Sequence, residues 1–385
     1  MTSAPLAGRG TGVAPWRDIR VIRVAAQVVV VGLVGLLAAF LLRNLLTAMD
    51  QRGLGFGFGF LDSTAGFAIS ETPIPYSATD TYGLAFLVGL LNTLFVSAVG
   101  IVLATLLGLV VGVARLSRNF LVNRVAAGYV EIIRNTPLLV QLFFLYAFLL
   151  QLPGVADSVA LPGGIFLNQR GLSLPAPVFS PTLSAWMAFV ALGIGLAIAA
   201  RIVLPRGIRS IGLLAILAVP AIGWIVLGEA PIGVDPPVLQ RFNFTGGMTL
   251  SSGFTALLAG LVLYTAAFIG EVVRGGILAV RRGQVEAARA LGLSEGHILR
   301  LVVFPQALRV IVPPLTSQYL NLAKNSSLAI AIGYPDLFSV SQTMGNQTGQ
   351  PVSVIVMVMG TYLAISLVTS LLMNLYNRRV QVLER

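Results

Sequence analysis

The chain has 385 residues, of which 56% are hydrophobic and 10% charged, and its net charge is +11. Because soluble domains carry about 25% charged residues, this composition excludes an ordinary soluble enzyme and indicates a membrane protein. The absence of Cys and the single His297 exclude disulfides, Cys-ligated centres and a His-based metal site or catalytic triad. We therefore expect neither a metal site nor catalytic residues.

Uncharged runs predict the membrane-spanning helices, since about 20 mostly apolar residues are needed to cross the hydrocarbon core. We expect an all-α integral membrane protein with about eight such helices. In chain order they cover residues 24–42, 84–113, 128–150, 183–200, 210–228, 254–278, 307–331 and 353–376. The seventh is the weakest, because its uncharged part is short and Pro313 and Pro314 would bend it.

Basic residues gather in alternate segments between these helices. Lys and Arg are enriched in cytoplasmic loops, and one set of segments holds 20 of the 25 basic residues, whereas the other set holds four Arg and eight acids. This asymmetry predicts a multi-pass protein with both termini in the cytoplasm. The positive charge is then a record of membrane topology, and no nucleic-acid partner is expected.

The segments predicted to lie outside are rich in Gly and Pro. Residues 54–60 read LGFGFGF, and 151–181 contain five prolines. Such composition is typical of surface loops without packed structure.

The longest inner loop, residues 279–306, reads AVRRGQVEAARALGLSEGHILRLVVFPQ. Gln284 to Leu291 suits a short helix, Gly292 a helix stop, and Ser294 a cap for a second helix that ends near Val303. The pattern predicts two short helices that project into the cytoplasm. From pattern alone, they are either a docking element or a surface hairpin with no partner.

This loop also carries a family resemblance. Glu286, Ala287 and Ala288, followed by Gly292 and Pro305, resemble the EAA loop of ABC importer permeases, whose short helix docks on an ATPase subunit. Further segments are similar to the polar amino-acid branch of that superfamily: LVGLLNTLFVS at 87–97, YVEIIRNTPLLVQLFFLY at 129–146, AAFIGEVVRGGILAVRRGQVEAARALGL at 266–293 and PQALRVIVPPLTSQYLNLAKNSSLAIAIGYPDL at 305–337.

The resemblance implies a domain organisation. Residues 84–150 and 250–385 would form the five-helix core of a type I ABC importer permease, with its coupling loop at 279–306. An N-terminal anchor helix and periplasmic loop, 1–83, and a two-helix insertion, 151–249, would be added to that core. This long form, with GFLDSTAGFAISETPIPYSATDTYG at 59–83, resembles the Q-type permeases of general L-amino-acid and glutamate/glutamine/aspartate/asparagine uptake systems.

The function that the resemblance implies is that of a permease subunit of an ATP-driven importer of polar L-amino acids in the bacterial inner membrane. Its partners would be the lipid bilayer, a second permease, a cytoplasmic ABC ATPase dimer and a periplasmic amino-acid-binding protein. Glu286, Ala287, Ala288 and Gly292 would couple it to the ATPase. A P-loop needs a glycine-rich turn before its Lys, whereas the one lysine, Lys324, follows Leu322 and Ala323. We therefore expect no cofactor on this chain and ATP on a partner subunit.

An ion-coupled secondary amino-acid transporter is the alternative function. Such a protein would usually place several acids near the bilayer midplane, where this chain offers Glu271 and little else. The sequence offers few catalytic groups for an intramembrane enzyme, because the chain has one His, no Cys and no pair of intramembrane Asp residues.

Polar residues within the predicted spans are candidates for the substrate path, since charges inside a bilayer are costly and usually functional. Glu271 either holds a substrate ammonium or pairs with Arg274, three residues later. Lys324, with Asn325 and Ser326, either meets a substrate carboxylate or extends to an interface or an acidic partner. Asn92 and Thr93 either line the path or form hydrogen bonds to neighbouring helices, and Gln141 is a further pore candidate.

Overall fold

The computed structural model describes residues 19–51, 55–205 and 209–380. Within these ranges the chain is predominantly helical, and six helices are long and apolar enough to cross a membrane. A bent pair, α3 and α4, would make a seventh span, and the apolar part of α6 is shorter. The predicted membrane-spanning helical architecture is confirmed. The termini predicted to be cytoplasmic, residues 1–18 and 381–385, lie outside the described residues.

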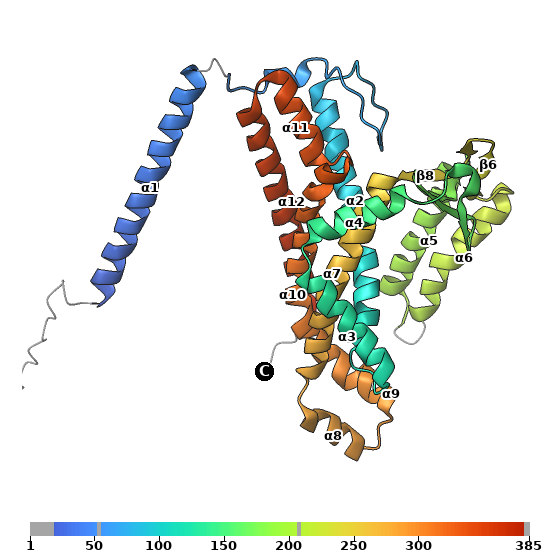
Figure 1. The fold of residues 1–385 in the computed structure, drawn as a ribbon. Helices are drawn as coiled ribbons and strands as arrows, with labels where there is room; N and C mark the ends of the chain where they lie inside the picture. The colour runs from blue at the N-terminus through green and yellow to red at the C-terminus, as the bar shows by residue number, and fades with distance from the viewer. Residues whose placement is uncertain (1–18, 52–54, 206–208, 381–385) are drawn as a thin grey trace, which may run out of the picture.

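The long helices follow the uncharged runs and extend beyond them (Figure 1). Their bounds are α1, Ile19–Gln51; α2, Tyr82–Ala114; α5, Leu183–Val203; α6, Arg209–Leu227; α7, Ser252–Leu278; α10, Phe304–Asn325; and α12, Pro351–Val380. The described side chains of α1 are almost all exposed, which suits a lipid-facing anchor. At one end of the helix bundle lie the short helices α8, Arg282–Ala290, and α9, Glu295–Ile298; we call this the knob end. The loop of residues 55–81 marks the opposite, loop end.

The bundle core lies between α2 and α7, with α4, α10, α11 (Leu337–Thr348) and α12 around them. Glycines on α2 allow the two central helices to touch. A Cβ built on Gly108 would lie 2.5 Å from the Cγ2 of Ile269, and one on Gly112 would lie 2.7 Å from the Cβ of Val273. Small residues spaced four apart bring membrane helices close together, as Gly108 and Gly112 do here.

The segment predicted as one helix over 128–150 is instead two helices. α3 spans Phe120–Asn135, α4 spans Leu138–Leu150, and they meet at 107°. Pro137 stands between them with extended backbone, and proline disfavours the helical conformation of the residue before it, Thr136. The prediction of one continuous helix over 128–150 is therefore wrong, although the bent pair together is apolar enough for one broken span.

The helix predicted over 307–331 starts earlier and is joined to the second helix of the knob. α9 continues through a π-helical turn at 299–303 into α10, and a 3-10 helix over Ser326–Ile332 follows. The π-turn ends just before Pro305, whose missing N–H interrupts the α-helical hydrogen bonds. The expected break near Val303 is wrong: residues Glu295–Ile332 form one helical run.

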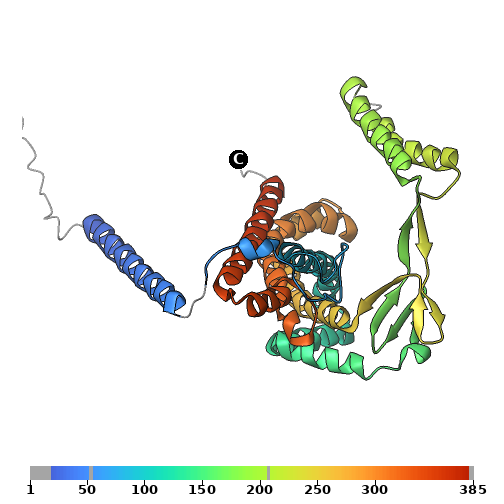
Figure 2. The same cartoon turned by 90° about the horizontal axis from the view of Figure 1, so that it is seen from above.

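The insertion also holds short strands that the sequence analysis missed. An antiparallel sheet has the order β1 (Val159–Leu161), β2 (Ile165–Asn168), β3 (Gly171–Leu174) and β8 (Met248–Ser251). Two-stranded ribbons pair β4 (Ala176–Phe179) with β5 (Ile232–Asp235), and β6 (Val238–Gln240) with β7 (Asn243–Thr245). The expectation of loops without packed structure is thus wrong for much of 151–181. The α5–α6 hairpin connects to the rest of the chain through β4 and β5 (Figure 2).

Candidate functional site

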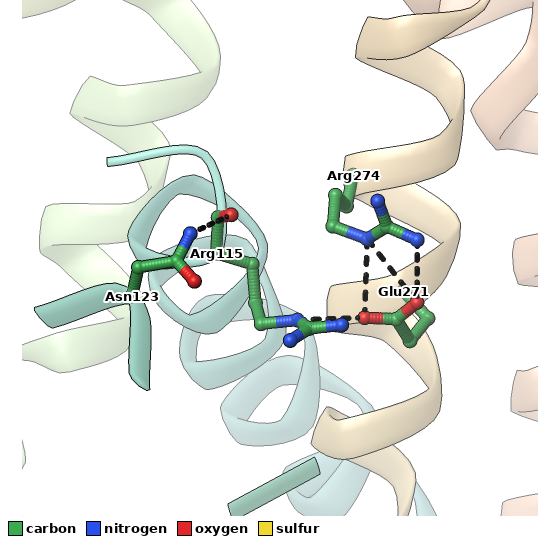
Figure 3. Close-up of polar contacts among 4 residues, drawn as sticks. All are labelled: Arg115, Asn123, Glu271 and Arg274. Atoms are coloured by element: carbon green, nitrogen blue, oxygen red, sulfur yellow. Dashed lines mark hydrogen bonds and ion pairs between the residues drawn. The ribbon is translucent and has the colours of Figure 1, made fainter. Parts of the chain in front are cut away.

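A cluster of charges joins α2 and α7 toward the knob end (Figure 3). Arg115 caps the end of α2, and its Nε lies 3.0 Å from the Oε1 of Glu271. On the next turn of α7, the Nη2 of Arg274 lies 3.1 Å from the Oε2 of the same carboxylate. The side chains of Arg115 and Glu271 are only 18% and 19% exposed, so this pair is screened less than a surface ion pair.

Local structure aims the guanidinium of Arg115 at Glu271. The glycines of α2 let that helix approach α7 closely over its last turns. The side-chain amide of Asn123, on α3, donates to the carbonyl oxygen of Arg115 at 2.6 Å and satisfies an orphan carbonyl at the end of α2 (Figure 3). Asn119 caps the start of α3 by accepting from the amides of Leu121 and Val122. These contacts fix the turn that carries Arg115.

A polar pocket of about 340 Å³ opens beside this cluster. The guanidinium of Arg134 lies over the ring of Phe268, 5.1 Å from its centroid, which suits a cation–π contact. The pocket therefore presents groups of both charge signs, as a zwitterionic ligand requires. Its lining residues are Arg115, Val130, Glu131, Arg134, Asn135, Phe268 and Glu271.

For Glu271, the structure confirms the intrahelical pair with Arg274 and adds a partner that the sequence analysis missed. The carboxylate is engaged by two guanidiniums, so a substrate ammonium would have to displace one of them. A signal for Arg115 was available in the sequence. It stands three residues after Gly112 on a helix whose glycines mark the face packed against α7.

Lys324 lies in the last turn of α10, and its side chain is exposed. No ion pair among the described residues involves it, so neither Glu271 nor Asp336 is its partner there. Asn325 is half-buried. Ser326 is buried, and its hydroxyl donates to the carbonyl oxygen of Ala323 at 2.9 Å. In this arrangement Ser326 stabilises the junction between α10 and the 3-10 helix.

Asn92 and Thr93 are buried near the loop end of α2 and form hydrogen bonds within the chain. The amide of Asn92 donates to the carbonyl oxygens of Glu71 and Pro335, at 2.9 and 2.8 Å. The hydroxyl of Thr93 accepts from the amide of Leu337 at 2.9 Å. These contacts fasten the start of α11 and the loop of residues 55–81 to α2, so the helix-packing alternative accounts for both residues.

Glu71 belongs to the same loop-end region, and the sequence analysis did not single it out. Its carboxyl accepts a hydrogen bond from the hydroxyl of Ser251, which in turn caps α7 by accepting from the amide of Phe254. Burial raises the pKa of Glu71 above its ordinary value, and the bond from Ser251 offsets part of that rise. A carboxyl that titrates abnormally thus holds the start of a central helix.

Gln141 lies just beyond the α3–α4 bend. Its amide donates to the carbonyl oxygens of Ile133 and Thr136, at 2.9 and 3.0 Å. The bend leaves the last carbonyls of α3 without helical partners, and the side chain of Gln141 satisfies two of them. Its observed role is to stabilise the bend.

The knob has the geometry expected of a glycine-ended helix. Gly292 has a φ of +77°, and its amide donates to the carbonyl oxygen of Arg289 at 2.9 Å, while that of Leu293 reaches Ala288 at 3.2 Å. These bonds form a Schellman motif, and the predicted helix end at Gly292 is confirmed. Ala288 is buried with Ile298 and Val303, whereas Glu286 and Ala287 are exposed. The knob therefore has its own small core and presents Glu286 outward.

The structure does not gather the predicted substrate-path residues in one cavity. Asn92 and Thr93 lie toward the loop end, Gln141 lies at the α3–α4 bend, and Glu271 lies toward the knob end. The charge cluster with its adjacent pocket and the projecting knob are the two features best suited to a function.

Comparison with known proteins supplies the family. Residues 100–382 match the model of the binding-protein-dependent transport system inner membrane component. The chain is 47% identical to the putative amino-acid ABC transporter permease protein YhdX of Escherichia coli (strain K12), with 94% of each chain covered. It is 44% identical to the general L-amino acid transport system permease protein AapQ of Rhizobium johnstonii, over 86% of this chain and 84% of that one.

A third relative also matches over nearly its full length. It is the glutamate/glutamine/aspartate/asparagine transport system permease protein BztB of Rhodobacter capsulatus, 39% identical over 96% of each chain. The aligned region therefore covers the insertion and the N-terminal helix as well as the core. On this evidence the chain belongs to the family of binding-protein-dependent transport system inner membrane components, as a permease.

Proposed function

We propose that this permease carries L-amino acids into the cell as part of an ATP-driven importer. The observation that carries the proposal is the 47% identity to a putative amino-acid ABC transporter permease over 94% of both chains. The names of two further relatives, which specify general L-amino acids or glutamate, glutamine, aspartate and asparagine, support a polar amino-acid substrate.

The proposed complex contains a second permease, a cytoplasmic ATPase dimer and a periplasmic amino-acid-binding protein. The knob supports this arrangement, because it is a compact, exposed element at one end of the bundle and its second helix continues into α10. Hydrolysis of ATP would take place on the ATPase subunits and would change the conformation of the permease through the knob.

Uptake by the reconstituted complex tests the proposal. Proteoliposomes that contain the complex, with ATP inside and binding protein outside, should accumulate radiolabelled glutamate, glutamine, aspartate or asparagine. Accumulation should persist with an ionophore present and stop when ATP is omitted. Uptake that disappears with the ion gradient and ignores ATP would instead support a secondary transporter.

The coupling role of the knob is tested at Gly292. Its positive φ is strained for any L side chain, so Gly292→Val should distort the Schellman motif and lower both uptake and substrate-stimulated ATP hydrolysis. The matched control is Gly296→Val in α9, where an added Cβ meets nothing within 4 Å and φ is not positive. Equal activity of the two variants would contradict coupling through Glu286, Ala287, Ala288 and Gly292.

The pocket beside Glu271 is the proposed inner part of the substrate path. Arg134 is the group available to a substrate carboxylate, and Glu131 the group available to an ammonium, because Glu271 is already paired. Glu131→Gln should therefore change the relative uptake of acidic, neutral and basic amino acids. Unchanged relative uptake would leave Glu131 without a role in selectivity.

A further inference from the structure

The ribbon of β4 and β5 exposes an apolar face that no helix or strand of the described chain covers. Opposed residues of an antiparallel pair lie on the same face, and here Phe179 opposes Ile232 and Pro177 opposes Val234. Phe179 is 60% exposed, Ile232 48% and Val234 71%. One face of this ribbon thus consists of four apolar side chains, of which two are β-branched and one is aromatic.

This face continues the exposed apolar surface of the α5–α6 hairpin. β4 ends at Phe179 and α5 begins at Leu183; α6 ends at Leu227 and β5 begins at Ile232. The last turn of α6 exposes Ile225 and Val226, which have no partner in the described chain and suit lipid. Both strands therefore adjoin helices whose exposed apolar surfaces suit the hydrocarbon core.

Tryptophans mark the level at which the hairpin leaves the membrane. Trp186 lies in the first turn of α5, and its indole N–H donates to the carbonyl oxygen of Pro220 on α6 at 3.0 Å. Trp224, in the last turn of α6, is 55% exposed. Trp is enriched where a protein crosses the membrane–water interface, and the ribbon lies seven residues before Trp186 and eight residues after Trp224.

The direction of the β4–β5 ribbon agrees with a position at the level of the two tryptophans. In the view from above, the strands are seen at length between the hairpin and the remainder of the chain (Figure 2). At the hairpin end, the amide of Ser180 donates to the carbonyl oxygen of Pro231, and the hydroxyl of Ser180 donates to Glu229. The exposed carboxylate of Glu229 places water close to this point. The ribbon thus runs sideways from the hairpin, next to an exposed carboxylate.

We propose that this apolar face lies against the lipid surface, in the headgroup region of the outer leaflet, and holds the β-structure of the insertion onto the bilayer. Phospholipid is the occupant that the continuity with α5 and α6 favours. Amphipathic segments bind there by burying an apolar face at the boundary of headgroups and acyl chains. The opposite face, which carries Val178 and Asp235, would then face water.

Photo-crosslinking of the intact complex in native membranes tests this proposal. The photoreactive analogue p-benzoylphenylalanine would replace Phe179 in one variant and Val178, its neighbour on the opposite face, in the control. Position 179 should give several-fold more phospholipid adduct than position 178 by mass spectrometry. A protein adduct at 179, or equal lipid adducts at both positions, would overturn the proposal.

A second measurement does not depend on the bulky analogue. The sequence has no Cys, so Val234→Cys and Val178→Cys each introduce the one thiol of this chain. With a membrane-impermeant maleimide, position 178 should react several-fold faster than position 234, also in cells that lack the binding protein. Equal rates, or protection of 234 only when the binding protein is present, would contradict lipid contact. Neither experiment measures uptake. Their outcomes therefore do not depend on which substrate the permease carries.

Discussion

At the scale of single residues, Glu271 is the most informative side chain. It is an acidic residue in a membrane helix, and its carboxylate already pairs with two arginines. Arg115 and Arg274 together leave the cluster with one net positive charge beside a pocket that also contains Glu131 and Arg134. Glu271 thus positions two guanidiniums, and the unpaired polar groups of the pocket remain available to a ligand.

Replacement of Arg115 measures how much the ion pair between α2 and α7 contributes to the stability of the protein. Arg115→Ala removes one charge-assisted hydrogen bond but leaves Arg274 to neutralise Glu271, so we expect a loss of roughly 1 to 2 kcal/mol. The melting temperature of the purified complex should fall. Arg118→Ala, which changes an exposed arginine on the same turn, is the control and should have little effect. Equal melting temperatures for the two variants would show that the contact does not contribute.

Glu71 makes the stability of the loop end depend on pH. Its pKa in the folded chain is raised above the ordinary value of 4.5, so the folded state binds the proton more tightly than the unfolded state does. The free energy of unfolding should therefore rise as the pH falls through the folded-state pKa toward 4.5, and fall as the pH rises. Glu71→Gln keeps an oxygen that accepts from Ser251 and removes this titration.

Thermal unfolding of both proteins between neutral and mildly acidic pH gives the measurement. The variant should be more stable than the wild type at neutral pH, and the difference should shrink as the pH is lowered. The other titratable groups are common to both proteins and cancel in the comparison. A difference that is constant with pH would contradict a raised pKa for Glu71.

At the scale of elements, the contact between α2 and α7 organises the bundle. Gly108 and Gly112 of α2 meet Ile269 and Val273 of α7 at distances that leave no room for a Cβ. Membrane helices gain little from hydrophobic burial against one another, so close packing and polar contacts hold them together. The charge cluster follows this packing, because the same approach of the two helices brings Arg115 to Glu271.

A pair of glycine variants tests this packing. A Cβ at Gly112 would lie 2.7 Å from the Cβ of Val273 and 2.9 Å from the carbonyl oxygen of Gly270. Gly112→Ala should therefore destabilise the protein by about 1 to 3 kcal/mol through overpacking. Gly128→Ala, on α3, meets nothing within 4 Å and should be neutral or stabilising through helix propensity. Melting temperatures that move in the same direction would contradict the packing argument.

At the scale of the whole molecule, the distribution of charge predicts orientation. The knob end should face the cytoplasm and the loop end the periplasm, and single cysteines can test this because the chain has none. Ala78→Cys in the loop of 55–81 should react with an impermeant maleimide on intact cells. Gly283→Cys in α8 should react only after the inner membrane is opened. Both positions are exposed, so burial does not account for a difference, and the reverse pattern would invert the topology.

The sequence predicted those features that depend on local pattern. Uncharged runs located most of the long helices, the glycine at 292 marked a helix end, and the spacing of Glu271 and Arg274 indicated their pair. Contacts between distant segments were not predictable in the same way. The ion pair of Arg115 with Glu271 depends on how two helices approach, and the short strands of the insertion have few residues and frequent prolines. Pro137 stands in the printed sequence, but the angle between α3 and α4 depends on packing.

The continuous run of helical turns from Glu295 to Ile332 has a mechanical consequence. It packs closely against α7 at Ile311, where a Cβ on Gly276 would lie 2.3 Å from the Cγ1 of that isoleucine. At 1.5 Å per residue, the arms on its two sides are roughly 24 Å toward the knob and 32 Å toward Ile332. A rigid tilt of the run about this contact would move its far end in the opposite direction and by a larger amount. In the proposed complex, the run would act as a lever that converts a small displacement at the knob end into a larger one at Ile332.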